Sequence, residues 1–283
     1  MIHTSRQLKA LVRNMSMGNS NKAQTIIRVY IMERFLERLS ISQYRDNLIL
    51  KGGLLVSAIV GLVNRSTMDM DTTIKGLTLS VESARMIVQE IASVPLEDGI
   101  VFKIRSAALI MDEADYPGVR VILETSLESM HTPLKIDFST GDVITPRETE
   151  YTFPLLFENR TIPILAYNLE TVLAEKMETL LARGTANTRM RDFYDIYVLE
   201  TTQLHDIDPA VFGCAYANTS KKRGSFAVNN DAAQILDEVT ASSDMKALWA
   251  DYRNRFDYAN NIAWDDVIKS VRKLFNIITW QNQ

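Results

Sequence analysis

The chain has 283 residues, 46% of them apolar, and a formal net charge of −4. This length and apolar content are enough for one large or two modest hydrophobic cores and exclude a disordered or fibrous protein. The acidic balance excludes indiscriminate nucleic-acid binding through bulk charge and leaves room only for local basic patches.

The cysteine count and the length of the apolar runs exclude further classes of protein. Cys214 is the one cysteine, so an internal disulfide framework and a cysteine-based zinc site are excluded, and three histidines leave few nitrogen ligands for zinc. The longest apolar run, residues 54–63, is too short to span a bilayer, and the N-terminus has no long apolar segment typical of a signal peptide. We therefore expect a cytoplasmic protein with no membrane partner.

The N-terminal part predicts helix, strand, turn and helix in that order. Residues 21–40 carry apolar side chains at helical spacing, with charged residues on the other faces. The apolar run 48–50, the pair Gly52-Gly53 and the run 54–62 then read as a strand, a glycine turn and a helix. Unsubstituted backbone N–H groups at a helix start can bind phosphate, so this turn is a candidate phosphate site; an ordinary strand-to-helix turn is the alternative.

Three aspartates are predicted on the polar faces of strands. Asp137 alternates with apolar residues in segment 134–139. Three carboxylates on neighbouring strands would repel, by roughly 4 kcal/mol for a pair about 4 Å apart at an effective dielectric near 20, and a cation would relieve the repulsion. Oxygen ligands suit Mg²⁺ or Mn²⁺, so we predict a metal site on all three; a solvated edge or turn is the alternative for an isolated Asp-x-Asp. In segment 65–74 the alternation assigns one strand face to Arg65, Thr67, Asp69, Asp71 and Thr73.

The remaining elements divide the chain into a mixed and a helical part. Ser80 is a candidate N-cap for a helix that ends before Pro95. We predict an α+β protein with a mixed-sheet domain over residues 1–165 and an all-helical domain over 166–283. Strands are predicted over 101–109, 119–127, 134–139, 151–157 and 161–165, and helices over 169–182, 189–202, 208–218, 230–240, 244–258 and 264–277.

The first two helices of the helical part carry a second group of candidate residues. Lys176 lies within an apolar stripe, so it must either extend to water or meet an anion. Gly184 is expected to end this helix, and Asn187 or Thr188 to cap the next one. Asp192 and Asp195 share a face there. The two acids and Arg191 could form a surface ion-pair ladder; alternatively, Lys176 reaches a triphosphate, Asp192 orients it and Asp195 pairs with a nearby arginine.

Taken together, these motifs resemble the AbiEii/AbiGii toxin-type nucleotidyltransferase family over residues 48 to 200. The motifs, in family order, are Lys51-Gly52-Gly53, the segment from Arg65 to Asp71, Lys135-Ile136-Asp137-Phe138, Ala174-Glu175-Lys176 and the segment from Arg189 to Tyr197. Gly53 stands where many nucleotidyltransferases have serine.

The resemblance implies a polymerase-β-like fold, in which Asp69 and Asp71 bind metal while Lys176 and Asp192 complete the nucleotide site. It also implies a toxin of a phage-defence toxin–antitoxin pair with a separate antitoxin chain. The expected activity is metal-dependent transfer of a nucleotide from an NTP to an acceptor, the 3′ end of tRNA or another RNA or a protein, which inhibits growth. We also place Arg65, Thr67 and Asp195 at the nucleotide.

Several alternatives stay open from the sequence alone. Asp137 could hold a second metal or act as base, and Arg189, Arg191 and the cluster 221–223 could contact RNA phosphates or be solvated. A metal-dependent RNA phosphodiesterase or a non-catalytic partner-binding protein could use the same residues. The antitoxin could act by binding or by modification, for example phosphorylation of Thr67, which would place negative charge beside Asp69. The NTP and the oligomeric state are left open.

Overall fold

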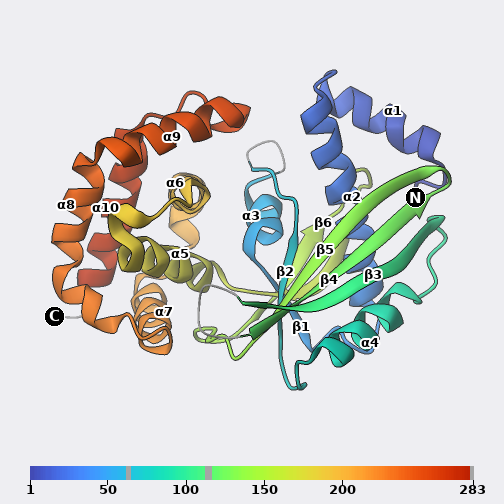
Figure 1. Ribbon diagram of the computed structural model, residues 1–283, viewed down its shortest axis with the longest axis horizontal. Coiled ribbons are helices and arrows are strands. Elements are labelled where there is room, and N and C mark those ends of the chain that lie inside the picture. Colours follow the sequence, from blue (N-terminus) through green and yellow to red (C-terminus); the bar gives the residue numbers. More distant parts are fainter. Residues whose placement is uncertain (62–64, 112–116, 281–283) are drawn as a thin grey trace. The chain divides into compact units, whose positions relative to one another are not determined.

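The computed structural model describes residues 1–61, 65–111 and 117–280, which form two compact units (Figure 1). The sheet unit comprises Met1–Leu62, Ser66–Asp142 and Glu148–Ala166. The helical unit comprises Val63–Arg65, Val143–Arg147 and Tyr167–Gln283. A mixed sheet followed by a helical C-terminal part confirms the predicted fold class.

The sheet unit is built on seven strands in the order β3-β4-β5-β2-β1-β7-β6. The β2–β5 and β1–β7 pairs are parallel and the others are antiparallel. The strands are β1 (Leu48–Lys51), β2 (Met70–Ile74), β3 (Ile100–Met111), β4 (Pro117–Leu127), β5 (Met130–Thr140), β6 (Thr149–Pro154) and β7 (Thr161–Ala166). The helices of this unit are α1 (Ser5–Ser16), α2 (Ser20–Ser40), α3 (Gly52–Val60) and α4 (Val81–Ala92).

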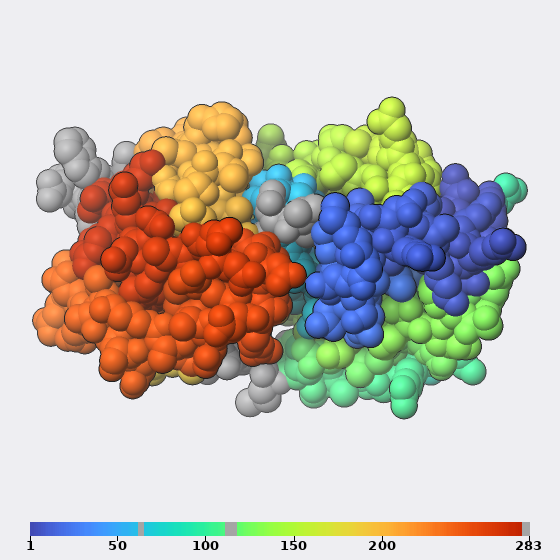
Figure 2. All heavy atoms as spheres, turned by 90° about the horizontal axis from the view of Figure 1, so that it is seen from above, coloured from blue at the N-terminus to red at the C-terminus, as the bar shows by residue number. Residues whose placement is uncertain are grey.

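Helices α2 and α4 pack on one face of this sheet, and the opposite face, called the polar face below, carries charged residues together with apolar ones such as Ile122. Helix α2 packs on β5 and β7, α4 packs on β3 and β4, and the two helices contact each other. In the space-filling view, the blue helices α1 and α2 lie beside the green strands (Figure 2). Strand β5 alternates as predicted: Leu134, Ile136 and Phe138 are buried, while Lys135 and Asp137 point to the other face.

The local signals for these elements were largely correct. The strand β1, the glycine turn and the helix α3 follow one another as predicted, and Ser80 caps α4 with its side chain. The expected end of the helical run, residues 62 and 63, lies outside the described residues. Helix α1, which Thr4 begins with a capping box, was not predicted from the apolar pattern.

Two sequence expectations in the sheet unit were wrong. Strand β2 begins only at Met70, so Arg65 and Thr67 do not share a strand face with Asp71, and Arg65 belongs to the helical unit. Helix α2 does not present its charged residues to solvent, because Glu33 and Arg34 are buried with its apolar ones.

The helical unit contains all six predicted helices. Helix α5 ends at Gly184, which has a positive φ of 50° and serves as its C-cap as expected. No helix among the described residues is both long and apolar enough to cross a membrane. The helices are α5 (Leu169–Arg183), α6 (Met190–Gln203), α7 (Pro209–Lys222), α8 (Ala232–Ala241), α9 (Ser243–Arg255) and α10 (Trp264–Trp280).

Candidate functional site

In the sheet unit, the carboxylate of Asp71 packs directly against the Gly52-Gly53 turn. Gly52 has a φ of +65°, and a Cβ placed on it would lie 2.1 Å from Asp71 Oδ2. The backbone N–H of Gly53 donates to the same oxygen over 3.4 Å. The turn between β1 and α3 therefore needs glycine, because any side chain would displace the carboxylate of Asp71.

Four charged residues form a row across the polar face of the sheet. Strand pairing places Lys51 beside Asp71, Asp71 beside Asp137 and Asp137 beside Arg120. Directly paired residues project to the same face, so the row reads cation, anion, anion, cation. Lys51 Nζ lies 2.7 Å from Asp142 Oδ2. Burial raises the pKa of Asp71, Lys51 acts against this, and the neighbouring charge of Asp137 adds to it.

Arg120 is a member of this row that sequence reasoning missed. Its Nε and Nη2 atoms donate to the two carboxylate oxygens of Asp137 over 2.8 and 2.6 Å. The one available signal was a basic residue between Val119 and Val121 in a predicted strand. That signal points to Asp137 only after the pairing of β4 with β5 is known.

Asp69 and Asp71 are better suited to binding a divalent cation as a pair than as part of a three-carboxylate site with Asp137. Asp69 directly precedes β2, and its carboxylate lies 3.8 Å from Lys135 Nζ. Asp69 and Asp71 both offer oxygen donors, the kind that Mg²⁺ and Mn²⁺ prefer, and neither is forked by a guanidinium. Within the described part of the chain no three acidic, histidine or cysteine side chains are grouped as metal ligands. The predicted site on Asp69, Asp71 and Asp137 stays a prediction.

The helical unit contains a buried ion-pair network that includes the second group of candidates. Lys176 on α5 donates to Asp192 Oδ1 over 3.0 Å and to Asp195 Oδ2 over 2.7 Å. Arg65 donates to both oxygens of Asp195, from Nε over 3.0 Å and from Nη2 over 3.2 Å. Arg189 Nε lies 2.9 Å from Asp192 Oδ2. Lys176 therefore meets anions and does not extend to water.

The ion pairs of this network keep Asp195 and Lys176 charged despite their burial. Burial alone opposes ionisation of Asp195, but Arg65 and Lys176 lower its pKa to about 2. Burial alone favours the neutral amine of Lys176, but Asp192 and Asp195 raise its pKa. Lys176 is thus a cation held in a fixed position, 12% exposed along its side chain.

The structure contradicts one alternative and one expectation around this network. The surface ladder with Arg191 does not form, because Asp195 is fully buried and its oxygens accept from Arg65 and Lys176. Helix α6 is not capped by Asn187 or Thr188: its N-cap position is Arg189, whose N–H donates to Asn187 Oδ1.

The other basic candidates differ in what they contact. Arg223 Nη1 donates to Glu178 over 2.7 Å, and its Nη2 lies 3.1 Å from Glu175, so this arginine ties the end of α7 to α5. The ammonium of Lys221 lies over the ring of Phe226. Contact of the 221–223 cluster with RNA stays a prediction, and Arg223 is its least available member.

Thr67 is placed so that modification would require local opening. Its residue is 2% exposed, and its hydroxyl donates to the backbone carbonyl of Asp69 over 3.3 Å. A phosphate on Thr67 would still lie two residues from Asp69. Regulation by phosphorylation of Thr67 stays a prediction.

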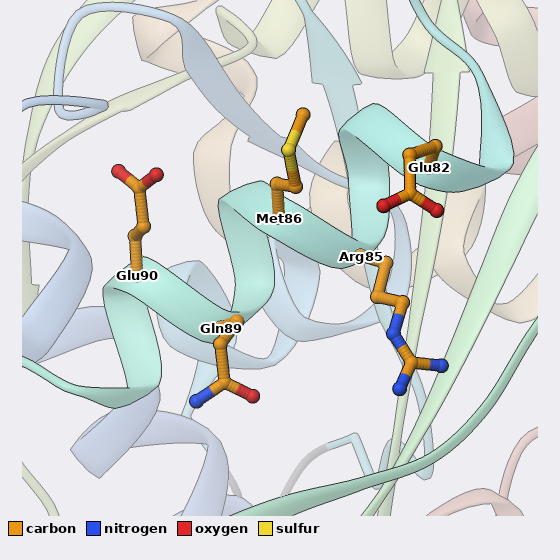
Figure 3. Close-up of a pocket in the computed structure, with 5 residues that line it drawn as sticks. All are labelled: Glu82, Arg85, Met86, Gln89 and Glu90. Carbon is orange, nitrogen blue, oxygen red and sulfur yellow. The ribbon is translucent and has the colours of Figure 1, made fainter.

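A hollow on helix α4 is distinct from these groups (Figure 3). All of its lining residues in the described part of the chain come from this one helix, and we assign it no function. Glu90 accepts a hydrogen bond from Tyr44 over 2.8 Å at its edge. The lining residues are Glu82, Arg85, Met86, Gln89 and Glu90.

Comparisons with known proteins bear on the family and the fold of the chain. A family model described as "Nucleotidyl transferase AbiEii toxin, Type IV TA system" matches residues 34–270. JHP933 from Helicobacter pylori is similar in structure, with a TM-score of 0.51, 13% identity, and 92% of this chain and 95% of that chain covered. An H. pylori protein described as a candidate nucleotidyltransferase gives a TM-score of 0.50, 12% identity and coverages of 91% and 97%. At such identities the two structures show a shared fold only. No curated protein matches the sequence.

Proposed function

The chain belongs to the AbiEii family of nucleotidyltransferase toxins of type IV toxin–antitoxin systems, and from that premise we propose that it transfers a nucleotide from an NTP to an RNA. The acceptor we propose is the 3′ end of tRNA, whose extension would stop translation and growth. Membership of this family also implies an antitoxin partner.

The observation that carries the proposal is the seating of Asp71 on the Gly52–Gly53 turn. A transferase that uses an NTP needs backbone donors for phosphate oxygens next to carboxylates that hold a divalent ion. Here the turn at the start of α3 and the carboxylate of Asp71 are 3.4 Å apart, measured from Gly53 N to Asp71 Oδ2. The phosphates of an NTP on this turn would lie beside Asp69 and Asp71.

The proposed reaction is an in-line displacement at the α-phosphate. A hydroxyl of the acceptor attacks the α-phosphorus, the bond to the bridging α–β oxygen breaks, and pyrophosphate leaves. Asp137 is proposed to accept the hydroxyl proton. Asp69 and Asp71 would hold Mg²⁺ or Mn²⁺, which supplies neutralisation of the developing negative charge.

Lys176 is the proposed cation for the phosphates of the NTP. Its ammonium is fixed between Asp192 and Asp195 and stays charged, so it could bind an anion without a large loss of side-chain entropy. Asp192 would orient it, and Arg65 would hold Asp195 in place.

The test is transfer of label by the full chain. Purified protein is incubated with Mg²⁺, total tRNA and each of the four α-labelled NTPs in turn. Label covalently joined to RNA of unchanged or increased length supports the proposal. Shortened RNA without label would instead establish a nuclease, and neither change would contradict an RNA-directed transferase.

Two variants with matched controls assign the residues. Asp71→Asn and Lys176→Ala are expected to reduce labelling by at least about 100-fold, because the first removes a proposed ligand of the divalent ion and the second removes the proposed cation for the phosphates. Asp46→Asn and Lys246→Ala make the same chemical changes at exposed positions and should label RNA as the unchanged chain does. On expression in cells, the two control variants should arrest growth as the unchanged chain does, and Asp71→Asn and Lys176→Ala should not.

A further inference from the structure

The two central acids of the charged row, Asp71 and Asp137, have different partners. Asp71 and Asp137 are direct neighbours on β2 and β5, so their charges repel across one strand spacing. Asp137 is compensated by Arg120, its direct neighbour on β4. Among the described residues, no arginine pairs with Asp71 in this way: its oxygen accepts from Gly53 N, and Lys51, whose amine lies 2.7 Å from Asp142, acts on it only as a nearby charge.

The contact between Arg120 and Asp137 is a planar fork. Both donors of the fork are closer than 3 Å to separate oxygens of Asp137, so the two planes of the side chains are fixed with respect to each other. The side chains are partly covered, with exposed fractions of 38% for Arg120 and 18% for Asp137. A fork on a sheet face, with both backbones fixed by strand pairing, is pre-organised in a way that a surface lysine is not.

A guanidinium in this position would oppose a second divalent ion. An ion bound to Asp137 would share the carboxylate with the positive charge of Arg120, and the two cations would repel at close range. An ion on Asp69 and Asp71 would meet two carboxylates, with Lys135 Nζ 3.8 Å from Asp69 as the nearby amine. The charges therefore favour one divalent ion over two.

We propose that Arg120 is a positioning residue that fixes Asp137 and takes the place of a second divalent ion, so that the chain binds one divalent ion, on Asp69 and Asp71. This inference rests on the proposed function and deepens it. In the transfer step, Arg120 holds the carboxylate that receives the proton of the acceptor hydroxyl. Arg120 itself neither gains nor loses a proton.

The test counts bound ions directly on the full chain, with Mn²⁺ alone as the probe. Free Mn²⁺ is measured by electron paramagnetic resonance during titration of the protein. The unchanged chain is expected to bind one Mn²⁺. Arg120→Gln, which removes the charge and keeps a similar length, is expected to bind two, because the carboxylate of Asp137 then has no guanidinium and can hold a second ion.

Two further variants separate charge from geometry. Arg120→Lys keeps the charge and loses the fork, so it should still bind one Mn²⁺ while transferring nucleotide at least about 10-fold more slowly. Arg105→Gln changes an exposed arginine of the adjacent strand β3 and should alter neither the ion count nor the rate. A purely structural arginine would leave the ion count at one in every variant.

The result that overturns the proposal is two Mn²⁺ ions on the unchanged chain with one of them lost in Asp137→Asn. One ion on correctly folded Arg120→Gln would overturn it as well. If Arg120→Gln fails to fold, Asp137→Asn decides alone, since the proposal requires that it still bind one ion. Failure of the proposed function is distinguishable, because it is read as absent RNA labelling by the unchanged chain whatever the ion count.

Discussion

Gly52 is the residue on which the position of Asp71 depends. Gly52→Ala should destabilise the protein by more than the roughly 1–2 kcal/mol that a left-handed conformation costs a residue with a Cβ, because that Cβ would overlap the Asp71 carboxylate. We also expect RNA labelling to fall at least about 100-fold, since the displaced carboxylate is the proposed metal ligand. Urea unfolding and the labelling assay measure the two effects.

Gly18 provides the control for this substitution. Its φ of +82° is equally left-handed, but a Cβ there would have nothing within 4 Å. Gly18→Ala should therefore show the conformational cost alone and full labelling. Equal losses of stability and activity in both variants would contradict the argument that the Asp71 contact requires glycine.

At this scale, the residue types indicated candidate residues but not which side chains pair with one another. Alternation within strand segments made Asp71 and Asp137 candidates, and its position in an apolar stripe made Lys176 a candidate. Arg65 was placed on a strand face with the aspartates because alternation continued through it, yet it is paired with Asp195 in the helical unit. A pairing 130 residues apart in sequence leaves no local trace in one sequence.

At the scale of the elements, the N-terminus of α5 is bonded to residues 143–147, a segment of the same helical unit. Asn168 is the N-cap of α5: its Oδ1 accepts from Thr171 N over 2.8 Å. Its Nδ2 donates to the carbonyls of Thr145 and Arg147 over 2.7 and 2.9 Å. Asn168→Ala should lower the free energy of unfolding by about 2–3 kcal/mol, the sum of a lost cap and two lost hydrogen bonds, as measured by urea denaturation.

Two comparison variants separate the cap from the segment contacts. Asp208→Ala removes the side-chain cap of α7, which makes only acceptor contacts to backbone N–H groups, and should cost about 1 kcal/mol. Asn168→Asp keeps the acceptor and loses the donors, so its stability should lie between those of Asn168→Ala and the unchanged chain. Full stability of Asn168→Asp would show that the contacts to residues 143–147 contribute nothing.

Helix boundaries were predictable because N-caps and C-terminal glycines are local signals. Which helix residues are buried was not predictable in this way. Helix α2 carries charged residues at positions that an amphipathic helix would expose, but it packs between β5, β7, α1 and α4. Some of its charged side chains are buried in ion pairs, for example Arg38, which donates to both oxygens of Asp98. Which face of a helix meets solvent depends on its neighbours, and that information is absent from its own spacing.

At the scale of the whole molecule, each unit carries a carboxylate with a lowered pKa that should make the fold sensitive to acid: Asp195 is buried and Asp142 is half-buried. The pKa of Asp195 in the helical unit and that of Asp142 in the sheet unit are both lowered to about 2, in each case because basic partners outweigh burial. A lowered pKa means that the folded state binds fewer protons than the unfolded state. Stability should therefore be lost as pH falls from about 4 to about 2, as seen by circular dichroism.

Glu33 in α2 should make the protein less stable as the pH rises, which is opposite to the effect of Asp195 and Asp142. It is 2% exposed, and burial raises its pKa to about 8, despite a hydrogen bond from Leu156 N and the nearby Arg34. The folded state therefore retains a proton that the unfolded state loses, and stability should decline as pH rises from about 4.5 to 8. Among the described residues, no hydrogen bond reaches Glu33 Oε2.

Glu33→Gln removes this titration and keeps an oxygen that can accept from Leu156 N. At pH 8 the variant should be more stable than the unchanged chain, on the order of 2 kcal/mol, because no charge need be buried. At pH 4.5 the two proteins should unfold at the same urea concentration, since Glu33 is protonated in the folded state there. Glu97→Gln, an exposed change in the same unit, should follow the unchanged chain at both pH values. A Glu33→Gln protein less stable than the unchanged chain at pH 8 would mean that the carboxylate is charged and stabilised by Arg34 in the folded state.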